Sequence, residues 1–426
     1  MSETSPRRPG RRTIARHGHL SQPSLLSRVM RWLGIAMACV LVAGVGVAAY
    51  AAWDFSATFA ADAQELEGQD TSPPDIGQLV NDEGVDLLLT GIDICEWDSH
   101  EKFGDRCPTE RSAYGDDGRQ LEAGLNDVNL LVHISPEPRK VSVVAFPRDL
   151  MGPMPECTNS ETGEVTPASD RRMLNEAYAA GGLACVAKSI DSITTQYDPE
   201  LAIDYAATVT WNGVIEITNA LGGVEVCVDQ TINDVDAGML YLEPGTHTLV
   251  GEQALAFLRS RHGVGGGDLA RISNQQVYMS SLARKLMSAE TLTNPGTLLS
   301  LARTTVSNVD PSAQLTPITL VQIAMAASSV PLSDIEFLQY PVLEDPLDRN
   351  RVVSDEAAAA QLFGLISANQ SVIPDEQVAA SPEPTEPEAP VESETPTPEV
   401  SETPTATAAP APGRTAEDTS CSNPIG

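Results

Sequence analysis

The chain has 426 residues and a formal net charge of −33, with 59 acidic residues against 26 basic ones. Hydrophobic residues make up 42% of it, which is enough for a folded core and excludes a wholly disordered chain. The acidic balance argues against broad nucleic-acid binding, because that binding needs a basic face that releases counterions from the phosphates. We therefore expect no nucleic-acid partner.

A basic segment precedes a long uncharged one at the N-terminus. Residues 1–32 carry seven arginines and one acidic residue, Glu3, whereas residues 33–53 carry no charge. About 20 helical residues span roughly 30 Å, the thickness of a bilayer core, and excess arginine marks the cytoplasmic side. We predict a single-pass helix at 33–53 that anchors the protein in the cell membrane, with a cytoplasmic N-terminus and an extracellular domain. The alternative is a cleaved signal peptide, but the apolar run is longer than a usual signal core.

Composition divides the remaining chain into three parts. Residues 54–84 are polar and acidic and are predicted to form an extracellular stalk. Residues 85–372 show dense apolar periodicity and form the predicted folded domain. Residues 373–426 hold 11 prolines and 11 acidic residues against one arginine. Such a segment buries too little apolar surface to offset its chain entropy, so we predict a disordered tail.

Within the domain, apolar runs predict strands and helical spacing predicts helices. The predicted strands are 85–92, 128–134, 141–147, 201–209 and 224–228, and the predicted helices are 183–193, 211–221 and 274–286. Near-continuous apolar strands are typical of sheets that are covered on both faces. Strands that alternate with helices predict an α/β fold, here a three-layer α-β-α domain with a central mixed sheet.

One hairpin can be indexed from the sequence. The connector 135–140 is too short for a crossover, so strands 128–134 and 141–147 should pair antiparallel. If Ile134 lies opposite Val141, then Asp127 faces Arg148 at the far end of the hairpin. Asp93 directly follows the strand 85–92 and emerges at the same edge if that strand runs parallel to 141–147. The hairpin therefore predicts two carboxylates and a guanidinium at one edge of the sheet.

Five of the seven cysteines lie in the predicted domain: Cys95, Cys107, Cys157, Cys185 and Cys227. An exported domain makes disulfides plausible. Cys95 with Cys107, and Cys157 with Cys185, are the natural local pairs, which leaves Cys227 without a predicted partner. The other two cysteines are Cys39 in the apolar run and Cys421 in the predicted tail.

Several arginines cluster beyond a short predicted helix at 251–257. If Arg259 and Arg261 are extended, their side chains point the same way and form a planar fork suited to phosphate oxygens. Arg271 follows at the start of the next helix, with Gln275 inside it. The alternative interpretation is that each arginine forms a surface salt bridge, since acidic residues are so numerous.

Acidic residues at the sheet edge complete this hypothesis. Asp93 and Asp127 would repel each other unless a cation lay between them, and Mg²⁺ commonly bridges carboxylates to phosphates. A pyrophosphate-bearing substrate would satisfy both the metal and the arginines. Phosphoryl transfer needs little more than positioning and charge stabilisation.

At these residues the sequence resembles the LytR-CpsA-Psr family of cell-wall glycopolymer ligases, of the actinobacterial type. The resemblance lies in VDLLLTGID (85–93), DVNLLVHI (127–134), VSVVAFPRD (141–149), MLNEAYAAGG (173–182), NALGGVEVCV (219–228), GEQALAFLRSRH (251–262) and GDLARISNQQ (267–276). These stretches occur in family order. The spacing of Cys157 and Cys185 is also similar to that of actinobacterial members.

The resemblance implies a membrane-bound transferase. Such proteins move an anionic glycopolymer from a polyprenyl-pyrophosphate carrier to a peptidoglycan hydroxyl, with the lipid in an apolar tunnel between sheet and helices. By resemblance, the acids near Mg²⁺ or Mn²⁺ are Asp93 and Asp127, the pyrophosphate-binding arginines are Arg148, Arg259 and Arg261, and Arg271 and Gln275 begin the motif Arg-x-x-Arg-Gln-Gln. Arg148 and Asp127 are the expected catalytic residues.

Three positions depart from the family pattern. Leu125, Met173 and Asn274 stand where members carry an arginine, a lysine and an arginine. Arg171 or Arg172 is a candidate replacement for the lysine. The missing cations leave two alternatives to ligation: a non-catalytic module that binds polyprenyl phosphate or wall polymer, and a pyrophosphatase in which water replaces the acceptor.

Overall fold

The computed structural model describes residues 55–61, 63–66, 84–122, 124–160, 162–260, 268–373 and 411–422. The predicted cytoplasmic segment 1–32 and the predicted transmembrane helix 33–53 lie outside these ranges. Among the described residues, no helix combines the length and the apolar character that a membrane crossing requires. Part of the predicted stalk packs on the domain, because residues 55–61 are helical, Phe59 is buried and Gln64 forms a β-bridge with Ser312.

A seven-stranded mixed sheet forms the centre of the domain. In spatial order its strands are β13 (Val309–Pro311), β8 (Tyr205–Thr210), β1 (Val85–Ile92), β2 (Asn126–Ile134), β3 (Val141–Phe146), β14 (Ile335–Gln339) and β17 (Gly413–Thr415). The pairs β1–β8 and β3–β14 are parallel, and the other four pairs are antiparallel.

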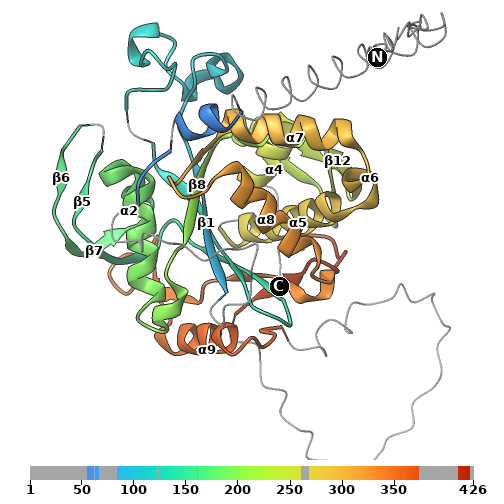
Figure 1. The fold of residues 1–426 in the computed structure, drawn as a ribbon. Coiled ribbons are helices and arrows are strands. Elements are labelled where there is room, and N and C mark those ends of the chain that lie inside the picture. Colours follow the sequence, from blue (N-terminus) through green and yellow to red (C-terminus); the bar gives the residue numbers. More distant parts are fainter. Residues whose placement is uncertain are drawn as a thin grey trace, which may run out of the picture. The chain divides into compact units, whose positions relative to one another are not determined.

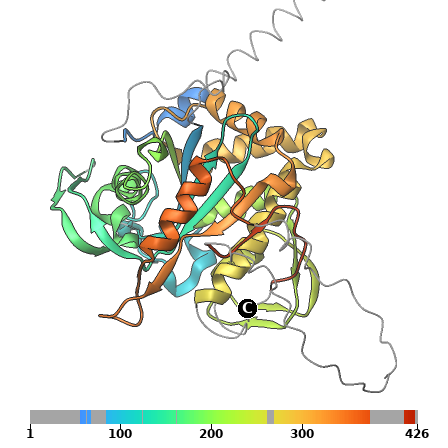
Figure 2. The same ribbon diagram turned by 90° about the horizontal axis from the view of Figure 1, so that it is seen from below.

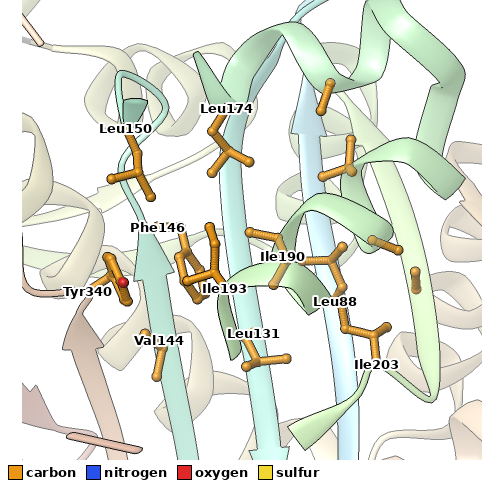
Figure 3. Close-up of a cluster of buried hydrophobic side chains, with 14 of the residues drawn as sticks. Leu88, Leu131, Val144, Phe146, Leu150, Leu174, Ile190, Ile193, Ile203 and Tyr340 are labelled. Atoms are coloured by element: carbon orange, nitrogen blue, oxygen red, sulfur yellow. The ribbon is translucent and has the colours of Figure 1, made fainter. Parts of the chain in front are cut away.

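Helices cover both faces of the sheet, which confirms the mixed α/β prediction (Figure 1). One face packs on α2 (Ala177–Thr194) and α9 (Glu356–Ser367), and the other on α3 (Trp211–Ala220), α5 (Asp268–Met287) and α8 (Pro317–Ser328). Leu88 points to the first helix layer, whereas its neighbour Leu87 points to the second. Figure 3 shows the first cluster, in which Ile190 and Ile193 of α2 lie against Leu88 and Leu131. Both faces of the sheet are therefore buried.

The remaining helices are α4 (Glu252–Arg259), α6 (Ala289–Leu292) and α7 (Pro295–Asn308), together with 3-10 turns at His100–Arg106, Arg111–Ala113, Leu174–Glu176, Pro199–Leu201 and Leu332–Asp334. Small two-stranded sheets pair β9 (Val224–Val228) with β12 (Gly245–Leu249), β10 (Ile232–Asp234) with β11 (Leu240–Leu242), β4 (Met151–Met154) with β7 (Ser169–Met173), β5 (Cys157–Thr158) with β6 (Val165–Thr166), and β15 (Val342–Glu344) with β16 (Val352–Ser354).

The predicted hairpin register is confirmed. Ile134 pairs with Val141, and the pairing continues to Asn129 opposite Phe146. Strand β1 is antiparallel to β2, so it runs in the same direction as β3, as the placement of Asp93 required. The short connector 135–140 fixes this register because it permits only a tight return.

The prediction of a disordered tail needs correction at its C-terminal end. Residues 413–415 form β17, which pairs with β14 and extends the central sheet. Cys421 forms a disulfide with Cys227, and the backbone N–H of Ser422 donates to the carbonyl of Cys227. The C-terminal segment (red in Figure 2) therefore adds the edge strand of the central sheet. The predicted pairs Cys95–Cys107 and Cys157–Cys185 are confirmed.

Candidate active site

A cavity of about 510 Å³ opens at the edge of the sheet where β1 ends and β2 begins. Six of the predicted site residues line it: Asp93, Asp127, Arg148, Arg259, Arg271 and Gln275. The seventh, Arg261, lies outside the described residues. The structure thus brings together side chains from β2, α4 and α5 and from the ends of β1 and β3, as the sequence predicted.

The two ends of the β2–β3 hairpin meet in an ion pair. Arg148 Nη1 donates to Asp127 Oδ1 at 2.9 Å, and Arg148 Nε lies 3.6 Å from an oxygen of Asp149. Asn126, which is fully buried, fixes the start of β2: its Nδ2 donates to the carbonyl of Leu174, and its Oδ1 accepts from the backbone N–H of Tyr178. The carboxylate of Asp127 is thereby held at the cavity by the first turn of α2.

Asp93 lies in an environment that disfavours its charge. Burial raises the pKa of its carboxyl, and the nearby carboxylate of Asp127 raises that pKa further. The backbone N–H of Leu125 donates to Asp93 Oδ1 at 2.5 Å, which acts in the opposite direction, and so does the charge of Arg148. Two carboxylates that repel each other favour a cation between them.

Arg259 is positioned by an aromatic ring. It is the last residue of α4, so the condition that Arg259 be extended is not met. Its guanidinium carbon lies 4.2 Å from the ring centroid of Trp211, a cation–π contact. Trp211 begins α3, and Thr210 caps that helix by accepting from the backbone N–H of Gly213. The cap fixes the helix start and hence the ring beneath Arg259.

The end of α4 is tied to its surroundings by hydrogen bonds. Ser260 Oγ donates to the buried carboxylate of Asp234, which also accepts from the backbone N–H of Ala237. Gln275 Nε2 donates to the carbonyl of Leu258 at 3.4 Å and joins α5 to α4. These contacts give the arginine-bearing wall of the cavity a fixed geometry.

The cavity also has an apolar wall, formed by side chains from β1, β2, β8, α3 and α4. Its members are Ile92, Val128, Val209, Val214, Leu255 and Leu258. Charged groups and apolar groups therefore share one cavity, which suits a ligand with an anionic head and a hydrophobic portion.

Sequence reasoning missed the charged or aromatic lining residues Arg106, Trp211, Asp234 and Asp236. Trp211 was assigned only to the apolar stripe of a helix, and the aspartates lie in and beside β10 without any motif. The one available signal for Arg106 was its place beside Cys107 in a cysteine-closed loop. None of these residues follows a strand of the β2–β3 hairpin, so the strand register could not predict that they line the cavity.

The proposed substitutes for the missing lysine are engaged elsewhere. Arg171 forms an ion pair with Asp345, and Arg172 Nε lies 3.4 Å from the carboxylate of Glu176. Neither arginine lines the cavity. Asn274, at a position where the resemblance expected an arginine, is buried and does not line it either.

Of the carboxylates that line the cavity, Asp93 and Asp127 are the interacting pair that fits a divalent ion. Within the described ranges no group of three or more His, Cys, Asp or Glu side chains is arranged to hold a metal. Mg²⁺ does not need such a group, since it commonly binds one or two carboxylates and completes its shell with water and substrate phosphates. The pair Asp93 and Asp127 matches that requirement.

Residues 52–364 of the sequence match the LytR_cpsA_psr family. The protein belongs to this family. The LytR-CpsA-Psr match includes every described site residue and begins close to the helical residues 55–61, which supports their assignment to the domain.

Two relatives show what this LytR-CpsA-Psr protein is similar to. Cell wall biosynthesis protein LcpA of Corynebacterium glutamicum is 29% identical over 238 residues, which cover 52% of this chain and 43% of LcpA. Polyisoprenyl-teichoic acid–peptidoglycan teichoic acid transferase TagU of Enterococcus faecalis is 24% identical over 259 residues, which cover 60% of this chain and 70% of TagU. The chain thus spans less than half the length of LcpA.

Among solved structures, the fold resembles protein gbs0355 of Streptococcus agalactiae. The TM-score is 0.51 at 20% sequence identity, and the match covers 70% of this chain and 92% of that one. At this identity the similarity concerns the fold. The mixed sheet with helices on both faces is thus a fold that this solved structure shares.

Proposed function

We propose that the protein is a membrane-anchored phosphotransferase that moves an anionic glycopolymer from a polyprenyl-pyrophosphate carrier onto peptidoglycan. The observation that carries this proposal is the cavity, in which arginines and paired carboxylates lie beside an apolar wall. Membership of the LytR-CpsA-Psr family and the transferase names of relatives such as TagU support it. The uncharged run at 33–53 is the proposed anchor, and the arginine excess before it supports a domain outside the cell.

The arginines bind the diphosphate in this proposal. Arg148 approaches the cavity from the segment just after β3, and Arg259 from the end of α4, so they can contact different phosphates of one diphosphate. Guanidinium groups form charge-assisted, bidentate hydrogen bonds with phosphate oxygens. The apolar wall takes the first part of the prenyl chain.

The proposed reaction is attack of a peptidoglycan hydroxyl on the phosphorus that carries the polymer. A new P–O bond forms to the acceptor, the P–O–P bridge breaks, and polyprenyl phosphate leaves. Arg148 and Arg259 stabilise the charge that develops on the phosphoryl oxygens. Asp127 is the candidate acceptor of the hydroxyl proton, which requires that the proposed metal leave its Oδ2 free, since Oδ1 accepts from Arg148.

Asp93 and Asp127 are the proposed ligands of Mg²⁺, or of Mn²⁺. When bound there, the ion would offset the charge of the diphosphate. Repulsion from Asp127 contributes to the raised pKa of Asp93. A cation bound between the two carboxylates would relieve this repulsion, so the raised pKa is consistent with the proposed role. Both residues line the same cavity as Arg148, so ion and guanidinium can act on one substrate.

A transfer assay tests this proposal. The full chain is reconstituted in lipid nanodiscs with a polyprenyl-pyrophosphate-linked wall polymer and peptidoglycan, and covalently attached polymer is measured with and without Mg²⁺. We expect transfer that requires Mg²⁺ and that falls in Arg259→Gln and Asp93→Asn. Transfer by these two variants at the wild-type rate would contradict the assigned site.

A second function is favoured by the missing cations. Arg171 and Arg172 are held by acidic partners outside the cavity, and Asn274 is buried away from it. A site with fewer cations can bind a lipid diphosphate without stabilising the transition state, as a non-catalytic binding or regulatory protein would. Tight binding of the carrier by wild-type protein without any transfer or hydrolysis would support this function over the first.

A further inference from the structure

A disulfide-closed loop contributes a cation to the cavity. Residues 95–107, named here the Cys95–Cys107 loop, are closed by a disulfide and end in the 3-10 turn His100–Arg106. Arg106 lines the cavity, and its Nη2 donates to the carbonyl of Asp236, which also lines it. Arg106 therefore reaches the cavity from this loop, whereas Arg148 reaches it from the end of the β2–β3 hairpin.

The loop is fastened to α3 at several points. Thr210 Oγ1 donates to the carboxylate of Glu96 at 2.7 Å, and Lys102 Nζ lies 3.6 Å from the carboxylate of Glu216. Phe103 packs on Trp211, with ring centroids 5.2 Å apart. The same Trp211 ring makes the cation–π contact with Arg259. The Cys95–Cys107 loop and Arg259 therefore both pack against Trp211.

Charge at the cavity shows what Arg106 contributes. The described lining residues include four arginines and four aspartates, namely Arg106, Arg148, Arg259, Arg271, Asp93, Asp127, Asp234 and Asp236. Their formal charges cancel, and without Arg106 the balance would be negative. The protein groups alone would then repel a diphosphate, and its attraction to the cavity would depend on the proposed metal ion.

We propose that Arg106 is a further substrate-binding residue, which contacts the diphosphate of the substrate and is positioned by the Cys95–Cys107 disulfide. The inference rests on the proposed function, because it assigns Arg106 to the same diphosphate. It also accounts for the family positions that lack a cation here: the positive charge comes from the loop, whereas Arg171 and Arg172 are held outside the cavity.

The probe is farnesyl diphosphate, whose binding to the full chain in detergent micelles is measured by calorimetry in the presence of Mg²⁺. We expect Arg106→Gln to weaken binding about 5- to 20-fold, the effect of losing one partly solvated charge-assisted contact. Arg106→Lys should recover most of this loss because it retains the charge. Arg349→Gln, which neutralises an exposed arginine that does not line the cavity, should leave binding unchanged.

The positioning role of the disulfide has its own test. Replacing Cys95 and Cys107 with alanine should weaken binding about as much as Arg106→Gln does, and adding Arg106→Gln to that variant should weaken it little further, since both changes remove one interaction. Replacing Cys157 and Cys185, a disulfide that lies outside the cavity, should leave the affinity unchanged.

The outcomes distinguish failure of the role of Arg106 from failure of the proposed function. If Arg148→Gln loses binding while Arg106→Gln binds like wild type, the role of Arg106 is overturned and the proposed function stands. Additive effects of the cysteine and arginine changes would overturn the positioning role of the disulfide. If wild-type protein does not bind farnesyl diphosphate, or Arg148→Gln binds it equally well, the diphosphate site and the role of Arg106 both fail.

Discussion

Arg148 Nη1 donates to Asp127 Oδ1 at 2.9 Å, and this contact joins the two ends of the β2–β3 hairpin at the mouth of the cavity. Both side chains keep some exposure to solvent, at 21% for Arg148 and 30% for Asp127. The pair is therefore accessible to a ligand, and its guanidinium has donors beyond the one that Asp127 accepts. A substrate phosphate can approach Arg148 while Asp127 holds it in place.

Loss of the Arg148 guanidinium should remove most of the transfer activity. We expect Arg148→Gln to lower the rate of polymer transfer by about 100-fold or more, because a positioned donor to the developing charge is lost. The measurement is the rate of polymer attachment in nanodiscs. The matched control is Arg139→Gln at the other end of the same hairpin, where Arg139 pairs with Glu137 at 3.1 Å, and it should transfer like wild type.

The ring of Trp211 should affect diphosphate binding because it holds the guanidinium of Arg259 in place. We expect Trp211→Leu to weaken farnesyl diphosphate binding by about 3- to 10-fold, because the cation–π contact that holds the guanidinium is removed. Trp211→Phe keeps an aromatic face and should lie between leucine and wild type. Calorimetric titration gives the affinities, and equal affinity of the leucine variant and wild type would refute this support role.

The C-terminal disulfide should stabilise the domain. Cys227 and Cys421 are 194 residues apart in sequence, and closing so long a loop restricts the unfolded chain strongly. We expect Cys421→Ala to lower the free energy of unfolding by about 2–5 kcal/mol, measured by denaturant titration under non-reducing conditions. Cys39→Ala, at the cysteine of the apolar run 33–53, is the control and should unfold like wild type. An unchanged midpoint for Cys421→Ala would contradict the prediction.

A buried carboxyl on α2 should give stability a specific pH dependence. Burial raises the pKa of Asp191 to about 6, and the charge of Asp86 contributes to the rise, while the backbone N–H of Ile203 donates to Asp191 Oδ1. The folded state thus binds the proton more tightly than the unfolded state. The stabilisation is fully present below about pH 4 and is lost as pH rises to about 6.

Asp191→Asn removes this titration and keeps an oxygen that accepts from Ile203. Relative to wild type, the variant should gain up to about 3 kcal/mol of unfolding free energy between about pH 4 and pH 6, with no further gain above that range. Denaturant titrations at a series of pH values measure the difference. A difference that stays constant from pH 4 to pH 7 would show that the carboxyl keeps its ordinary pKa in the folded protein.

The parts of the site that the sequence could predict are those fixed by local geometry. A six-residue connector and two apolar strands set the register that brings Asp127 to Arg148, and strand direction alone places Asp93 beside them. The arginine spacing after the predicted helix 251–257 suggested Arg259 and Arg271, with Gln275 beside them, and the motif resemblance strengthened that assignment.

The parts that could not be predicted depend on contacts between distant segments. Arg106 reaches the cavity because the Cys95–Cys107 loop is fastened to α3, more than 100 residues further along the chain. Cys421 lies in a segment whose composition, averaged over 373–426, indicates disorder, yet residues 413–415 add a strand to β14. Strand addition at a sheet edge depends on backbone hydrogen bonds, so side-chain composition gives little signal for it.

The most direct test of the central claim follows the phosphorus of the carrier. The polyprenyl-pyrophosphate-linked polymer is prepared with ³²P in the phosphate next to the sugar and is incubated with the full chain, Mg²⁺ and peptidoglycan. The account predicts that the label appears in a phosphodiester on peptidoglycan and that unlabelled polyprenyl phosphate is released. Label that remains with the prenyl chain, or that is released on free polymer phosphate, would contradict it.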